Sequence, residues 1–387
     1  MKYNIAMSKH NFDEEAIKKH LELKGKIVVE PKARVLTDED LSIYYTPGVG
    51  AVSRALAKDP SRAKELTIKS DMVAVVSDGS AVLGLGNVGP EAAMPVMEGK
   101  AMLLKQLAGI NAFPICLDTQ DTEEIIMTIK NIAPVFAGIN LEDIAAPKCF
   151  EIETRLHDEL NIPVIHDDQH ATAIAVMAGL INALKVVGKD KADCKTVIIG
   201  SGAAGIGVAK LLHKWGMGDI IMIDSKGIVS STREALDPSK QALLAITNKL
   251  DLSGGIQDAL KGSDIVLGLS QANLLTSDDI KLMNKDSIVF AMANPTPEIN
   301  PEDAIAGGAK VVATGRSDYP NQINNVLVFP GMFKGAIETS TNFVTDEIKL
   351  KAAESLAAIV DDPTQDNIIP GVFDAGVVDA IVQAFKG

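Results

Sequence analysis

Two pairs of adjacent carboxylates, Glu142-Asp143 and Asp167-Asp168, each follow an apolar stretch that is typical of a buried strand. Ligands bind at the carboxyl ends of the strands in parallel sheets, so we expect both pairs at one sheet edge. Acidic side chains gathered there repel one another unless a hard divalent cation, Mg²⁺ or Mn²⁺, binds between them. Helix capping is the alternative role, because Asp168 precedes an apolar helical stretch and Asp143 precedes a short turn.

Lys100 lies on the apolar face of a helix predicted over residues 91–108. It follows Met97 by three residues and precedes Leu104 by four, so the three side chains share one face. Apolar surroundings disfavour an ammonium group, and we therefore expect a lowered lysine pKa, in the range useful for proton transfer. The alternative is a lysine whose stem covers the core while its head reaches water.

A glycine-rich loop, Gly200-Ser201-Gly202-Ala203-Ala204-Gly205, follows a strand-like stretch and begins a helix. Such a loop brings backbone N–H groups and a helix N-terminus to a pyrophosphate, which predicts a dinucleotide site at Gly200, Gly202, Ala203, Ala204 and Gly205. A glycine turn needed only for packing is the alternative.

Asp224 ends the next strand, roughly 20 residues further on, where a carboxylate can accept hydrogen bonds from ribose hydroxyls. Its charge repels a 2′-phosphate and favours NAD. Ser225-Lys226 could instead contact that phosphate, so NADP remains open.

Other polar and glycine segments have weaker patterns. A second glycine loop, Gly84–Gly89, is followed by Glu91, which would lie where phosphates bind, so we interpret it as a turn that shapes another site. Asn294 and Asn325 stand close to prolines, where asparagine forms turns or contacts a ligand. His166 and His170 without a third ligand do not make a zinc site.

Strand-like runs alternate with helical runs, which predicts an α/β fold with mainly parallel sheets in two domains. We place the boundary near residue 160, between an N-terminal substrate and metal domain (1–160) and a Rossmann-type dinucleotide domain with C-terminal helices (161–387). A charged helix is expected over 13–23, and Thr37 begins another helix with a capping box. Strands are expected at 72–76, 112–117, 135–139, 163–165, 196–199, 220–223, 265–268, 288–291 and 310–313.

Composition restricts the class of partner. The 387 residues are 47% hydrophobic and 4% aromatic, and 37 basic against 51 acidic residues give a net charge of −14. This balance argues against nucleic acid or an anionic membrane as the main partner. Three cysteines without a paired spacing favour a reduced, cytoplasmic location. The apolar stretch 171–184 is predicted to be a buried helix and not a membrane span.

Taken together, these segments resemble the malic enzyme family in the short form found among bacteria, archaea and some protists. The resemblance implies NAD(P)-dependent oxidation of L-malate, then metal-assisted decarboxylation to enolpyruvate and protonation to pyruvate. The matching segments run in family order across nearly the whole chain: 45–49, 77–90, 97–100, 141–143, 166–170, 200–205, 293–296 and 324–331.

The resemblance also implies roles for single residues. It assigns the general base to Lys100, the general acid to Tyr45, the metal ligands to Glu142, Asp143 and Asp168, the carboxylate that orients the lysine to Asp167, and substrate contacts to Asn294 and Asn325, with Asn294 also beside the cofactor. Longer members hold the substrate carboxylate with an arginine, and Ala81 occupies that position here. Which group replaces the arginine is left open.

Two other functions compete with oxidative decarboxylation. One is non-oxidative conversion of malate to lactate at the same site with retained NAD. The other is a cofactor-binding regulatory protein that has lost the chemistry, against which the intact set of Tyr45, Lys100 and Asp168 argues. The segment before Tyr45 is too short and polar to form its own core, so we expect it to pack on a partner subunit. The resemblance implies a homodimer, in which Tyr45 completes either its own site or the neighbour's.

Overall fold

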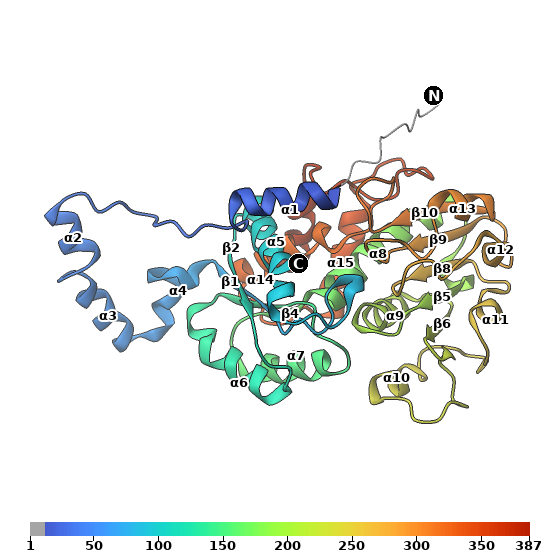
Figure 1. Cartoon of the computed structure of the whole chain (residues 1–387), viewed down its shortest axis with the longest axis horizontal. Coiled ribbons are helices and arrows are strands. Elements are labelled where there is room, and N and C mark those ends of the chain that lie inside the picture. The colour runs from blue at the N-terminus through green and yellow to red at the C-terminus, as the bar shows by residue number, and fades with distance from the viewer. Residues whose placement is uncertain (1–11) are drawn as a thin grey trace.

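The computed structural model describes residues 12–387, which form two sheets flanked by helices (Figure 1). The first sheet has the order β2-β1-β3-β4 with parallel pairing throughout. The second has the order β10-β9-β8-β5-β6-β7 and is parallel except at the β6–β7 pair. The strands are β1 (Met72–Ser77), β2 (Asn111–Cys116), β3 (Gly138–Leu141), β4 (Val164–His166), β5 (Lys195–Ile199), β6 (Asp219–Asp224), β7 (Gly227–Ile228), β8 (Ile265–Gly268), β9 (Ser287–Ala291) and β10 (Ala309–Thr314). The predicted two-domain α/β class is confirmed.

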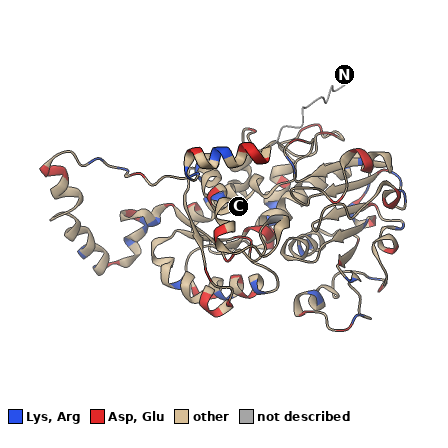
Figure 2. Ribbon diagram, viewed as in Figure 1, with Lys and Arg blue, Asp and Glu red and all other residues tan. Residues whose placement is uncertain are grey.

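Helices cover both sheets, and charged residues are frequent on outer helices such as α1, α6 and α7 (Figure 2). The α-helices are α1 (Phe12–Leu23), α2 (Asp38–Tyr44), α3 (Val49–Lys58), α4 (Ala63–Leu66), α5 (Pro90–Ala108), α6 (Thr122–Ile132), α7 (Lys148–Glu159), α8 (Asp167–Val187), α9 (Ala203–Trp215), α10 (Pro238–Leu243), α11 (Ile256–Leu260), α12 (Ser277–Ile280), α13 (Pro301–Ala306), α14 (Phe329–Thr339), α15 (Asp346–Ala357) and α16 (Val377–Lys386).

All nine expected strands are present, with one displaced. Residues 135–139 were expected to be extended, but Ala133–Val135 forms a 3-10 turn and β3 begins at Gly138. Pro134 lies inside that turn and has no N–H to donate to a neighbouring strand, which explains the later start. The short β7, which the apolar pattern did not predict, folds back on the end of β6.

The N-terminal arm, which we define as residues 27–68, extends away from the body of the molecule (Figure 1). The expected first helix is present as α1, and Thr37 caps α2 in the expected capping box with Asp40. Large apolar side chains of the arm face solvent, among them Leu36 at 79% exposure and Ile43 at 57%. Within the described part of one chain, these apolar side chains of the arm are therefore left uncovered.

Helix α8 leads from the last strand of the first sheet into the second domain and packs on α9 and α15. It is long and apolar enough to cross a membrane, but most of it is buried inside the protein, as the sequence predicted. Strand β4 lies beyond residue 160 and still pairs with β3. We therefore propose that the domain boundary lies at the start of α8, because the hydrogen bonds of β4 belong to the first sheet.

Candidate active site

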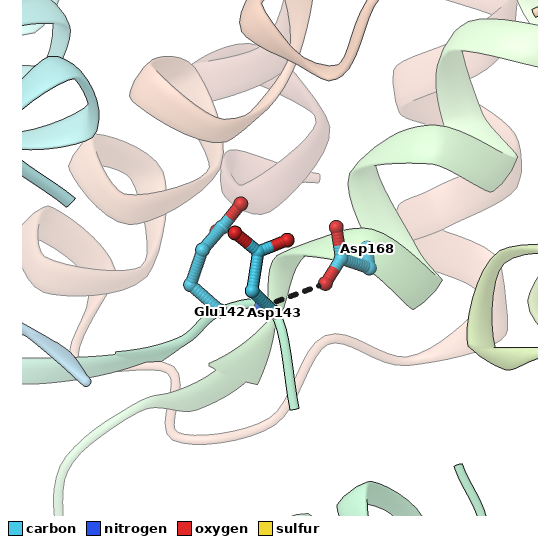
Figure 3. A group of neighbouring side chains, drawn as sticks. All are labelled: Glu142, Asp143 and Asp168. Carbon is cyan, nitrogen blue, oxygen red and sulfur yellow. Dashed lines mark hydrogen bonds between the residues drawn. The ribbon is translucent and has the colours of Figure 1, made fainter. Parts of the chain in front are cut away.

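The two acidic pairs lie at the ends of neighbouring strands, β3 and β4. Leu141 pairs with His166 in the sheet register, so the residues that follow each strand are brought together. Glu142, Asp143 and Asp168 each offer an oxygen within 4.8 Å of the others (Figure 3). Three carboxylate oxygens at such spacing are suited to a hard divalent cation.

The backbone at Asp143 aims its side chain into this group. Asp143 has a φ of 54°, a left-handed conformation that aspartate tolerates better than most residues. Its N–H donates to Asp168 Oδ2 at 3.1 Å, and its carbonyl accepts from the N–H of Ala81 at 2.9 Å. These bonds join the chain after β1, β3 and β4 at one point. The acids are thus positioned by backbone hydrogen bonds and not by helix capping alone.

Lys100 reaches the same group from α5. The side chain is 9% exposed, and its Nζ lies 3.0 Å from Glu142 Oε1 and forms an ion pair with the fully buried Asp167. The Phe329 ring covers the ammonium, with its centroid 4.3 Å from Nζ. A snorkelling lysine is excluded by this burial.

The expectation of a lowered lysine pKa is wrong for the metal-free chain. Burial by itself lowers the pKa of Lys100, but the carboxylates of Asp167, Glu142 and Asp168 outweigh burial and raise the pKa above its ordinary value. The sequence pattern identified the apolar helix face and missed the acids that approach it from β3 and β4. In this state Lys100 is a charged partner of Asp167.

The ionised form of Glu142 is disfavoured by burial and by the neighbouring acids. Burial raises its pKa well above the ordinary value, Lys100 opposes this, and the charges of Asp168, Asp167 and Asp143 add to it. Asn140 donates to the second Glu142 oxygen at 3.0 Å, which fixes the carboxyl group in place. A buried acid surrounded by acids gains most from a bound cation, so the donor set fits Mg²⁺ or Mn²⁺.

A cavity of about 750 Å³ joins this cluster to the glycine loop that begins α9. The structure places most of the predicted site residues in its wall: Lys100, Glu142, Asp143, Asp168, Gly202, Ala203, Ala204, Asn294 and Asn325. Asp167 lies behind Lys100 and is completely buried. Tyr45 is not brought there, because it lies on the N-terminal arm and is 65% exposed.

The glycine loop between β5 and α9 has the geometry that close backbone approach requires. Gly200 has a φ of 114°, and a Cβ built there would lie 2.3 Å from the carbonyl oxygen of Leu269. A Cβ on Gly205 would lie 1.8 Å from the oxygen of Gly200. Strand β5 pairs with both β6 and β8, so the loop stands where the strand order reverses, which is where ligands bind in such sheets.

The second glycine loop belongs to the same cavity. Gly84 lies in its wall, and a Cβ there would lie 2.4 Å from the carbonyl oxygen of Asn294. This close approach brings the loop after β1 against the segment after β9. The absence of a side chain at residue 84 therefore lets the two domains meet at the site.

Asp224, the predicted ribose contact, is held by two cations. Arg233 donates to both of its oxygens at 2.8 and 3.0 Å, and Lys240 donates to Oδ2 at 2.9 Å. Burial alone would raise the Asp224 pKa, but these hydrogen bonds lower it to about 2. The carboxylate is thus ionised, and its charge is largely offset. The sequence argument that Asp224 repels a 2′-phosphate is weakened accordingly.

Some residues of the site were not predicted from the sequence. Phe329, His20 and Lys26 line the cavity, and no spacing pattern connects them to it. Arg233 and Lys240 follow β6 closely, and their positive charge after Asp224, the predicted ribose contact, was the available signal.

Comparisons with known proteins agree with this geometry. The model of the malic enzyme N-terminal domain matches residues 24–157, and that of the malic enzyme NAD-binding domain matches 169–383. An NAD-dependent malic enzyme of Geobacillus stearothermophilus is 54% identical over 93% of this chain and 76% of its own length. A bifunctional malic/malolactic enzyme of Bacillus subtilis is 49% identical over 96% of this chain and 91% of its own length. The crystal structure of an NAD-dependent malic enzyme from Thermotoga maritima superposes with a TM-score of 0.92 at 47% identity, covering 96% of this chain and 99% of the other.

The first matched model covers β1 to β3 of the first sheet and the second covers all strands of the second sheet, so the predicted resemblance is confirmed. The chain therefore belongs to the malic enzyme family, with an N-terminal malic enzyme domain followed by an NAD-binding domain.

Proposed function

We propose that the protein oxidises L-malate to pyruvate and CO₂ with reduction of NAD(P)⁺, in a reaction that depends on Mg²⁺ or Mn²⁺. The observation that carries the proposal is the single cavity shared by Lys100, the three carboxylates and the dinucleotide loop. A buried lysine, carboxylates suited to a cation and a loop suited to a dinucleotide hydride acceptor lie around one cavity, and oxidation of a 2-hydroxy acid requires these components.

A cation held by Glu142, Asp143 and Asp168 would supply positive charge beside the C2 oxygen and cancel part of the negative field that raises the Lys100 pKa. Lys100 Nζ, once neutral, accepts the proton of the C2 hydroxyl. Asp167 holds Nζ in position through their ion pair, and the Phe329 ring excludes water above it. Asn294 and Asn325 contact the substrate from the opposite domain.

Tyr45 donates the proton that converts enolpyruvate to pyruvate, and we propose that it does so in the cavity of a second copy of the chain. Its support is the position of Tyr45 on the N-terminal arm, whose exposed apolar side chains have no partner within one chain among the described residues. Apolar surface of this extent favours association. Two such arms related by a two-fold axis would form a homodimer.

A test of the function is the steady-state rate with L-malate, measured with NAD and NADP side by side, with and without Mn²⁺. Metal-dependent formation of reduced cofactor together with pyruvate is the expected result. The absence of reduced cofactor under all four conditions would contradict the proposal. Lactate formed without net reduction of the cofactor would instead favour the malolactic alternative. The Bacillus subtilis relative, a bifunctional malic/malolactic enzyme, is the reason to test for it. Cofactor binding without either product would favour a regulatory role.

Mn²⁺ is expected to raise the melting temperature, and more strongly at pH 8 than at pH 6. Glu142 has a raised pKa in the metal-free fold, so a proton competes with the cation. Binding releases that proton, and apparent affinity therefore rises with pH. At a metal concentration 100 times Kd the stabilisation is about 2.7 kcal/mol. Calorimetry should show this Mn²⁺-dependent rise in melting temperature in the wild type and not in Asp168→Asn. An equal rise in Asp168→Asn would mean that the cation binds elsewhere.

Replacing Arg233 with methionine is expected to reduce kcat/KM for NADP more than for NAD. The substitution removes the bidentate partner of Asp224 and leaves Lys240 alone to offset its charge. Since hydrogen bonds to charged groups contribute about 1.5–3 kcal/mol, the NADP/NAD ratio should fall roughly 10- to 100-fold. Lys310→Met, an exposed lysine on β10 at the other end of the sheet, is the matched control. An unchanged NADP/NAD ratio of kcat/KM would show that Arg233 has no part in recognising the 2′-phosphate.

A further inference from the structure

We propose that Lys26, assisted by His20, holds one carboxylate of the substrate and takes the place of the arginine that Ala81 cannot supply. This inference rests on the proposed function, because it names the group that would recognise a dicarboxylate. Both residues belong to the N-terminal segment that precedes the first sheet. Both line the cavity that also contains Ala81, Lys100 and Glu142.

Lys26 is fixed against α5. The turn that ends α1 has left-handed backbone at Lys24 and at Gly25, and it places the N–H of Lys26 3.1 Å from Glu98 Oε2. The Lys26 Nζ donates to the carbonyl oxygen of Pro95 at 2.6 Å. An ammonium group has three donors, and among the described residues no second acceptor takes one of them. Lys26 is therefore held at the cavity wall with donors to spare.

His20 supplies an independent observation. Its Nδ1 lies 2.7 Å from the carbonyl oxygen of Ala16, which can only accept, so Nδ1 carries a proton. Its Nε2 is buried and has no hydrogen-bond partner among the described residues. A buried polar atom without a partner costs free energy unless a ligand or water satisfies it. A carboxylate bound beside it would accept a hydrogen bond from the imidazolium form.

The charge of the cavity calls for such a group. Its wall carries Glu142, Asp143 and Asp168, and Lys100 is already paired with Asp167 and Glu142. A divalent cation cannot balance these acids and both charges of malate. Among the described residues that line the cavity, the lysines are Lys100 and Lys26. Burial lowers the Lys26 pKa, and the charge of Glu98 opposes this lowering. A bound carboxylate would act in the same direction as Glu98 and stabilise the charged form of Lys26.

The test measures binding of succinate and of butyrate, which differs from succinate by a methyl group in place of one carboxylate, to protein loaded with Mn²⁺ and NAD. Titration calorimetry on the wild type should show tighter binding of succinate. In Lys26→Met that preference should fall by roughly 10- to 100-fold, the range for a hydrogen bond between charged groups. Lys26→Arg, which keeps the charge, should retain most of it, and His20→Asn should give an intermediate loss. The KM for malate should rise by the same factor as the succinate Kd, with kcat less affected.

Lys18→Met is the matched control, because it removes the same charge from an exposed position on α1, the helix that carries His20 and precedes Lys26. Succinate preference that survives in Lys26→Met, or that is lost equally in Lys18→Met, would overturn the inference. Melting curves of each variant show whether the fold is kept, and rescue by arginine separates lost charge from lost folding. Malate turnover with an unchanged KM in Lys26→Met would refute this inference alone. A wild type that binds succinate through Lys26 yet does not turn over malate would refute the proposed function alone.

Discussion

Replacing Lys100 with methionine is expected to lower kcat for malate oxidation by roughly 10²- to 10⁴-fold, the usual contribution of a positioned general base. Methionine keeps most of the volume against the Phe329 ring and removes the Nζ that forms ion pairs with both Asp167 and Glu142. Stopped-flow and steady-state measurements of reduced cofactor at saturating malate and Mn²⁺ would give the size of the loss.

The same variant should also be less stable without metal. Removing one partner of a buried ion pair leaves an uncompensated charge and costs about 3–5 kcal/mol. Added Mn²⁺ should recover part of this, since Glu142 then gains another cation. Lys105→Met is the control, because Lys105 lies on the exposed face of the same helix and donates to Asn111. Turnover that stays at the wild-type level in folded Lys100→Met protein would mean that the base lies outside this cavity.

Mixing inactive Tyr45→Phe and Lys100→Met subunits is expected to restore activity. In a two-fold dimer whose arms cross, a mixed dimer contains one site with both Lys100 and Tyr45 intact. Half of freely exchanged dimers are mixed, so the mixture should reach roughly a quarter of wild-type activity. Activity would be assayed after exchange, with dimer composition checked by mass spectrometry of differently tagged chains.

A double variant distinguishes the two arrangements further. When Tyr45→Phe/Lys100→Met chains exchange with wild-type chains, crossed arms leave both sites of a mixed dimer incomplete, and activity should fall below the wild-type chain's share. If the two residues act within one chain, each mixed dimer keeps one intact site. Confirmed exchange without recovery in the first mixture, together with full retention in the second, would place Tyr45 in its own subunit's cavity.

Local patterns predicted much of the molecule. The strands were predicted because apolar runs of strand length indicate buried β-structure, and the acids were placed at strand ends because Glu142 and Asp167 follow those runs directly. The glycine loop was predicted because its glycine spacing lies between a strand-like run and a helical run, and Gly205 is required by a contact within that turn, with the carbonyl oxygen of Gly200. Each of these features depends on residues close together in the chain.

Residue patterns were enough to predict the two-domain α/β class and to select the candidate acids, lysine and glycines. The three-dimensional arrangement was needed to show that Asp167 raises the Lys100 pKa, that Arg233 offsets the charge of Asp224, that Tyr45 lies outside its own chain's cavity and that Lys26 lines it. The physical reason is that periodicity is set by neighbours along the chain, whereas a group's charge state and its access to a cavity depend on side chains from distant segments.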